Sequence, residues 1–150
     1  MRRPTPGLKA SLVTAGLAAL LAGAPAIASP AEDYMLYCMG CHGADARGVP
    51  GKVPPLAGSL ALFMRTPEGR NYVLRVPGAA NSALSDAQLC AVLNWIAERY
   101  AAPGAAPAPA PFTAPEVART RHVPLVSVQA TRRQVVSALA AAGSAPPADY

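Results

Sequence analysis

The chain has few side chains that could carry chemistry. Its 150 residues include three cysteines, two histidines and four methionines, and only 14% are charged and 5% aromatic. A closed structural zinc site needs four ligands. Beyond the cysteines and histidine of residues 38–42, only Cys90 and His122 remain, one on an expected apolar helix and one far along the chain. The sequence therefore disfavours a zinc site.

Sustained alternation of apolar and polar residues is also lacking, so we expect no β-sheet and an all-α fold. Thr66 and Pro67 resemble a helix cap and first turn, and Ser85 with Gln88 forms a capping box. Ser29 is the expected cap of the first helix. We expect helices over residues 31–38, 67 to about 76, 86–101, 113–120 and 129–142.

The chain has one long apolar run, residues 10–28, which is short and rich in small residues for a transmembrane helix of about 20 strongly apolar residues. Arg2, Arg3 and Lys9 precede it, and Ala26 and Ala28 form an A-x-A pattern. These features predict a secretory signal peptide, residues 1–28, cleaved after Ala28. The alternative is an uncleaved anchor; after cleavage no membrane span is expected.

The net charge of +5 is spread unevenly. The predicted signal peptide carries +3, residues 29–102 hold six basic and six acidic side chains, and residues 103–150 carry +2. Nucleic-acid binding needs a clustered basic face with aromatic residues for stacking. No such cluster is present, so we expect no nucleic-acid partner.

Composition divides the rest of the chain into three parts. Residues 29–102 are expected to form a folded domain, residues 103–111 (PGAAPAPAP) a Pro/Ala linker, and residues 112–150 a C-terminal helical extension. Five residues of the extension are apolar enough to pack on another surface: Val126, Val128, Val135, Val136 and Leu139. That surface is either the domain or a docked partner.

Two of the three cysteines and one histidine occur in Cys38-Met39-Gly40-Cys41-His42. C-x-x-C-H is the pattern of c-type haem attachment, whereas a thioredoxin-like C-x-x-C lies near a βαβ unit. Thiols three residues apart on a helical turn share one face, so both can reach the vinyl groups at one edge of a porphyrin. The motif predicts one covalent haem c on Cys38 and Cys41, with His42 as the proximal iron ligand.

The stretch CMGCHGADARGVPGKVPPLAG resembles the CxxCHG…G…PxLAG opening of bacterial class I cytochromes c. The resemblance covers about residues 30–100 and implies that family's fold around one covalent haem. It implies that Tyr34 and Trp95 pack where the first and last helices of the domain cross. It also implies that the Pro54 carbonyl accepts a hydrogen bond from Nδ1–H of His42.

The family's distal methionine is missing from the expected loop, PGAANSAL at residues 77–84. Met64 lies in the middle segment, where it is either the distal ligand or a pocket-wall side chain. Asn81 and His122 are the other candidates. Cys90 is expected to be buried as a small hydrophobic residue.

The resemblance implies a periplasmic electron carrier, not an enzyme, whose donor is a dehydrogenase and whose acceptor is a cytochrome or an oxidase. Two alternatives are open. One, which rests on the loop without methionine, is a haem-based gas-binding or sensing protein with an open or labile distal site. The other is a haem subunit of a larger oxidoreductase.

Overall fold

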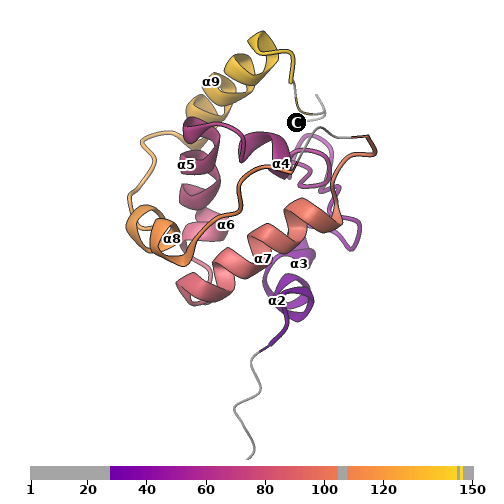
Figure 1. The fold of residues 1–150 in the computed structure, drawn as a ribbon, viewed down its shortest axis with the longest axis vertical. Coiled ribbons are helices and arrows are strands. Elements are labelled where there is room, and N and C mark those ends of the chain that lie inside the picture. The colour runs from indigo at the N-terminus through magenta and orange to yellow at the C-terminus, as the bar shows by residue number, and fades with distance from the viewer. Residues whose placement is uncertain (1–27, 105–107, 145, 147–150) are drawn as a thin grey trace, which may run out of the picture.

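Helices make up the regular structure of the residues that the computed structural model describes, which are 28–104, 108–144 and 146 (Figure 1). The predicted signal peptide lies outside these residues except for Ala28, and so does part of the predicted linker. The helices are α2 (Pro30–Tyr37), α3 (Met39–His42), α4 (Leu60–Phe63), α5 (Pro67–Arg75), α6 (Pro77–Ala80), α7 (Asp86–Arg99), α8 (Ala114–Thr120) and α9 (Val128–Ala141).

Side-chain caps start the main helices where the sequence predicts them. Ser29 and Ser85 each form a capping box, and the Thr66 hydroxyl accepts a hydrogen bond from the Gly69 N–H. Each cap satisfies one of the backbone donors that a helix start leaves unpaired. The predicted helix boundaries are therefore confirmed to within one or two residues.

β-structure in the described part of the chain is limited to one isolated antiparallel bridge between Val49 and Val53. The all-α fold class is thus confirmed. In the same residues, no helix has both the length and the apolar character that crossing a membrane requires.

An aromatic cluster joins the two ends of the predicted domain. The rings of Tyr34 on α2 and Trp95 on α7 have centroids 5.6 Å apart, and Tyr100 lies 5.7 Å from Tyr34 and 5.8 Å from Trp95. Such tilted and edge-on pairs stabilise a contact beyond their buried area. The contact of Tyr34 with Trp95 is the one that the family resemblance implies.

The C-terminal extension packs on the domain through both of its helices. α8 contacts α7 and α5, and α9 contacts α5 and α4. Val135 and Leu139 are buried as expected, and Val128 and Val136 are partly buried against the core. Val126 is fully exposed, so it does not pack on the domain. It belongs to the loop that precedes α9, where no element covers it.

Arg70 on α5 holds the start of the extension. Its guanidinium donates two hydrogen bonds to the Glu116 carboxylate, at 2.7 and 2.6 Å. It also donates to the Ala110 and Pro111 carbonyls and lies 4.3 Å from the centroid of the Phe112 ring. The hydrogen bonds from Arg70 lower the pKa of the Glu116 carboxyl. A bidentate Arg–carboxylate pair of this kind fixes orientation as well as supplying attraction.

Asn94 on α7 makes a second attachment. Its Oδ1 accepts the backbone N–H of Phe112 at 2.8 Å, and its Nδ2 donates to the Phe112 carbonyl at 3.0 Å. The Cys90 thiol donates to the same carbonyl at 3.1 Å. Cys90 is half-buried against the core and hydrogen-bonded, whereas the sequence predicts a buried residue that behaves only as a small hydrophobe.

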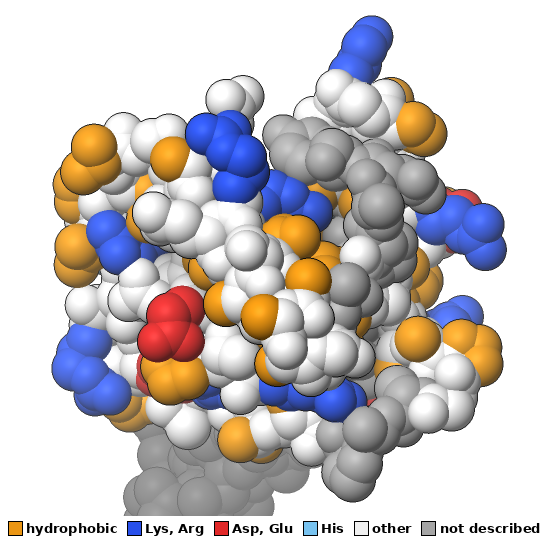
Figure 2. Space-filling model, turned by 90° about the horizontal axis from the view of Figure 1, so that it is seen from above, with side chains coloured by type: hydrophobic (Ala, Val, Ile, Leu, Met, Phe, Trp, Pro, Cys, Tyr) orange, Lys and Arg blue, Asp and Glu red, His pale blue; other side chains and the backbone are white. Residues whose placement is uncertain are grey.

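Basic residues are spread over the surface. Figure 2 shows Lys and Arg side chains at separate places on one face of the molecule, without a single large cluster there.

We predict that Asn94→Ala lowers the free energy of unfolding by about 1–3 kcal/mol, because it leaves the N–H of buried Phe112 unpaired and removes a donor from its carbonyl. The control is Asn81→Ala, the same change at an exposed site, which should cost less than about 0.5 kcal/mol. Denaturant unfolding of both variants measures the difference. Equal values would contradict the assigned role of Asn94.

Candidate functional site

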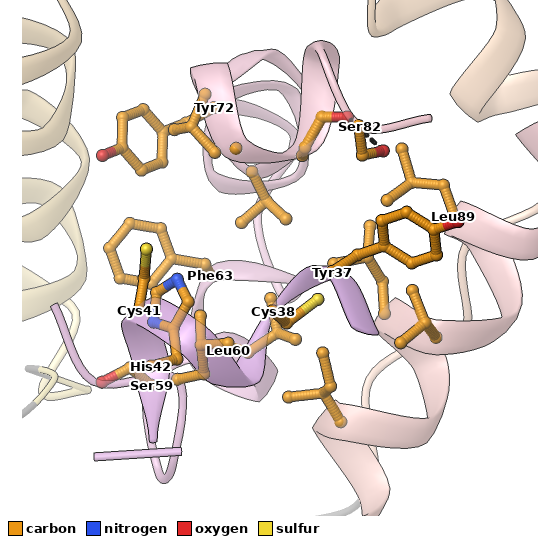
Figure 3. A pocket seen from close by; sticks show the side chains of 18 of the residues that line it. Tyr37, Cys38, Cys41, His42, Ser59, Leu60, Phe63, Tyr72, Ser82 and Leu89 are labelled. Carbon is orange, nitrogen blue, oxygen red and sulfur yellow. Dashed lines mark hydrogen bonds between the residues drawn. The ribbon is translucent and has the colours of Figure 1, made fainter. Parts of the chain in front are cut away.

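An apolar cavity lies between the Cys38–His42 segment and the middle of the chain (Figure 3). α7 contributes Leu89, Val92, Leu93 and Ile96 to its lining. Residues of α5, α6 and the loop that follows line the side across from Cys41 and His42, where Figure 3 shows Tyr72 and Ser82. Most of the lining is apolar, so the cavity suits a large hydrophobic group that has a few polar atoms.

The turn through Cys38 and α3 brings both thiols and the imidazole to one wall of this cavity. The N–H groups of Cys41 and His42 donate to the Cys38 carbonyl, at 3.2 and 3.0 Å. The cysteines are not joined in a disulfide. Burial raises the pKa of the Cys38 thiol to about 11. A redox-active C-x-x-C needs a lowered thiol pKa, so the geometry favours covalent attachment over thiol exchange.

His42 is oriented by one hydrogen bond, from Nδ1 to the Pro54 carbonyl at 3.0 Å. Because a carbonyl can only accept, Nδ1 carries the proton. Burial lowers the pKa of the imidazole, although the bond to Pro54 opposes that shift. The ring is therefore neutral at neutral pH, and its Nε2 lone pair is available to a metal.

Gly48 lets the Pro54 carbonyl approach closely; the family pattern includes one glycine in this loop but does not distinguish Gly48 from Gly51. Its φ is +69°, and a Cβ there would lie 2.3 Å from the Val53 carbonyl oxygen and 2.8 Å from that of Pro54. The Gly48 N–H also donates to the His42 carbonyl at 2.8 Å. Neighbouring glycines in the loop look equivalent in sequence, so only the three-dimensional approach singles out this one.

Two tyrosines hold the chain that leaves the motif. The Tyr34 hydroxyl donates to the Gly43 carbonyl at 2.6 Å, and that of Tyr100 donates to the Ala44 carbonyl at 2.9 Å. Burial raises the pKa of Tyr34 to about 12, so its hydroxyl remains a donor. Tyr34 and Trp95 do not line the cavity; they fix the α2–α7 crossing that carries it.

The candidate distal ligands are not brought to this cavity. Met64 is only 3% exposed, but it lines a separate hollow with Thr66 and Arg70. Asn81 and His122 are exposed and also lie outside the lining. Within the described residues, the lining includes no methionine and no histidine other than His42.

The cavity fits a haem chemically. Ser59 lines it at 3% exposure, and its hydroxyl has no hydrogen-bond partner within the described part of the chain. A buried hydroxyl is normally paired, so a group with a polar acceptor, such as a haem carboxylate, would complete it. The described residues contain no cluster of three or more His, Cys, Asp or Glu suited to a metal ion alone.

Comparison with characterised proteins gives two relatives, both named cytochrome c-552 and both from Thermus thermophilus. The chain is 33% identical to the first over 125 residues, covering 70% of this chain and 84% of that protein. It is also 33% identical to the second over 111 residues, covering 61% and 85%. No family model matches the chain. The 70% of the chain that the first match covers is longer than the predicted domain of residues 29–102.

We predict that Gly48→Ala destabilises the protein by about 3–5 kcal/mol, because the left-handed backbone strain is joined by displacement of the Pro54 carbonyl. Gly51→Ala is the matched control. Its φ is +70° but its Cβ would meet nothing within 4 Å, so only the strain of about 1–2 kcal/mol is expected. Denaturant unfolding measures the two costs, and NMR follows exchange of the His42 Nδ1 proton, which should accelerate only in Gly48→Ala. Matching behaviour of the two variants would refute the role of Gly48.

Proposed function

The chain belongs to the class I c-type cytochromes, and from that premise we propose that it is an exported carrier that moves one electron at a time from a dehydrogenase to a downstream cytochrome or oxidase. Its relatives support the broader statement that it is a haem c electron-transfer protein. The observation that carries the proposal is the neutral imidazole of His42, oriented by Pro54 beside two unpaired thiols in one apolar cavity.

Each residue of the motif has a proposed part in holding the cofactor. Cys38 and Cys41 would hold the haem through thioether bonds, and His42 would bind its iron through Nε2. The bound haem supplies a one-electron Fe(III)/Fe(II) couple. Pro54 keeps the imidazole ring in one orientation and makes it a stronger electron donor to the iron. Leu60, Val92 and Ile96 exclude water from the site, and a dry site favours the form of lower charge.

The surface beside Cys38 supports a carrier that docks briefly with partners. Tyr37 lines the cavity and is 47% exposed, and Met35 and Leu36 next to it are 52% and 71% exposed. Apolar side chains on the rim of a cofactor site give a partner a dry surface close to the cofactor. We propose that partners dock there, that the protein acts in the periplasm after cleavage at Ala28, and that it has no catalytic residue of its own.

A second function is favoured by one observation, the absence of methionine from the described lining of the cavity. An iron without a sixth protein ligand binds small molecules, as a gas-binding or sensing protein requires. Met64 as distal ligand would require residues 59–66 to move its thioether from the neighbouring hollow into the cavity.

Carbon monoxide distinguishes the two functions. For a carrier with Met64 as the distal ligand, the ferric protein shows the weak far-red Met-to-iron band, and the ferrous protein binds carbon monoxide slowly. Met64→Ala removes the band and speeds binding by at least about tenfold, because a coordinate bond no longer has to break first. Met35→Ala is the control, since Met35 is exposed. Stopped-flow mixing and potentiometry measure the rates and the one-electron couple. Rapid binding by the wild type without a reversible couple would contradict electron transfer and support the second function.

A further inference from the structure

Arg121 is a buried cation contributed by the C-terminal extension. It follows α8 directly and is 4% exposed. Burying an arginine is costly unless its N–H groups are paired. An apolar residue would fill the same place with a smaller desolvation cost. The role of this guanidinium is therefore sought in the contacts that it makes.

The guanidinium binds one short segment of the domain, the end of α6 and the loop that leads to α7. Nη1 donates to the Leu84 carbonyl at 2.8 Å and to the Asp86 carboxylate at 3.1 Å. Nη2 donates to the Ser82 carbonyl at 2.8 Å, with longer contacts to the Ser82 hydroxyl and the carbonyls of Ala79 and Ala80 at 3.4 to 3.5 Å. The planar fork of arginine can serve several acceptors at once.

The same segment forms a wall of the haem cavity. Ala79, Ser82 and Leu84 all line it. Figure 3 shows Ser82 on the side of the cavity across from Cys41 and His42. Most carbonyls of this segment have no helical partner, because α6 is four residues long and α7 starts only at Asp86. Arg121 therefore supplies donors that the segment cannot provide for itself.

We propose that Arg121 is a positioning residue that makes the C-terminal extension part of the haem site. It holds residues 79–84 closed across from His42, and so restricts the access of small ligands to the iron. The proposal rests on haem binding at Cys38, Cys41 and His42, but it holds for a carrier with a sixth ligand and for a protein with an open distal position. In both cases an external ligand would approach the iron on the side of the cavity that this wall lines.

The test uses ferric holoprotein with cyanide as the probe, together with hydrogen exchange of the backbone amides. Arg121→Gln should raise the cyanide association rate and the exchange of residues 79–84 by about tenfold or more, because hydrogen bonds from a charged donor no longer hold the segment closed. Amides at the α2–α7 crossing should change little. Arg119→Gln, the same change at an exposed position on α8, should behave as the wild type.

Arg121→Lys separates charge from geometry. Lysine keeps the positive charge but lacks the planar fork of arginine. Arg121→Lys should therefore accelerate cyanide binding and amide exchange less than Arg121→Gln does, and only at residues 79–84. If Arg121→Gln yields no holoprotein, Arg121→Lys alone decides the question. Wild-type cyanide rates and wild-type exchange at residues 79–84 would overturn the proposal. A uniform rise in exchange across the chain would overturn it too, because it would mean a loss of global stability only. Failure of the wild type to bind haem would instead refute the proposed function.

Discussion

The hydrogen bond between His42 Nδ1 and the Pro54 carbonyl is the constraint on which the site depends. It fixes the tautomer of a neutral imidazole whose pKa burial has lowered, and so aims Nε2 into the cavity. Gly48 lets the Pro54 carbonyl approach, and the Tyr34 and Tyr100 hydroxyls hold the backbone just after the motif. The aromatic contacts between α2 and α7, together with the loop that follows the motif, therefore help to hold the His42 ring in one orientation.

The two sides of the cavity are built in different ways. Residues close in sequence make the histidine side, with Cys38, Cys41 and His42 on one turn. The facing wall depends on the C-terminal extension, which Arg70 and Asn94 attach to the domain and whose Arg121 contacts residues 79–84. The extension is therefore packed directly against the domain, although a Pro/Ala stretch separates the two in sequence.

Local patterns were enough to predict much of the fold and one side of the site. Helix caps at Ser29, Thr66 and Ser85 depend on neighbouring residues, and the C-x-x-C-H spacing acts within one turn, so both can be read along the chain. Arg121 acts on residues that only folding brings near, so no local pattern marks it. The family pattern includes a glycine in the loop before Pro54, but only the structure shows that Gly48, not Gly51, meets the Pro54 carbonyl. The place of Met64 in the sequence makes it a candidate ligand, yet its buried side chain lies in a neighbouring hollow.

Mass analysis of the protein tests the central claim most directly. After proteolysis, the peptide that contains Cys38 and Cys41 should carry the added mass of one haem, bound through two thioether bonds that thiol reductants do not cleave. The intact chain should show haem absorption in the same proportion. Recovery of that peptide with two free thiols, or with a Cys38–Cys41 disulfide, from protein made in cells that attach haem to other c-type cytochromes would contradict the account.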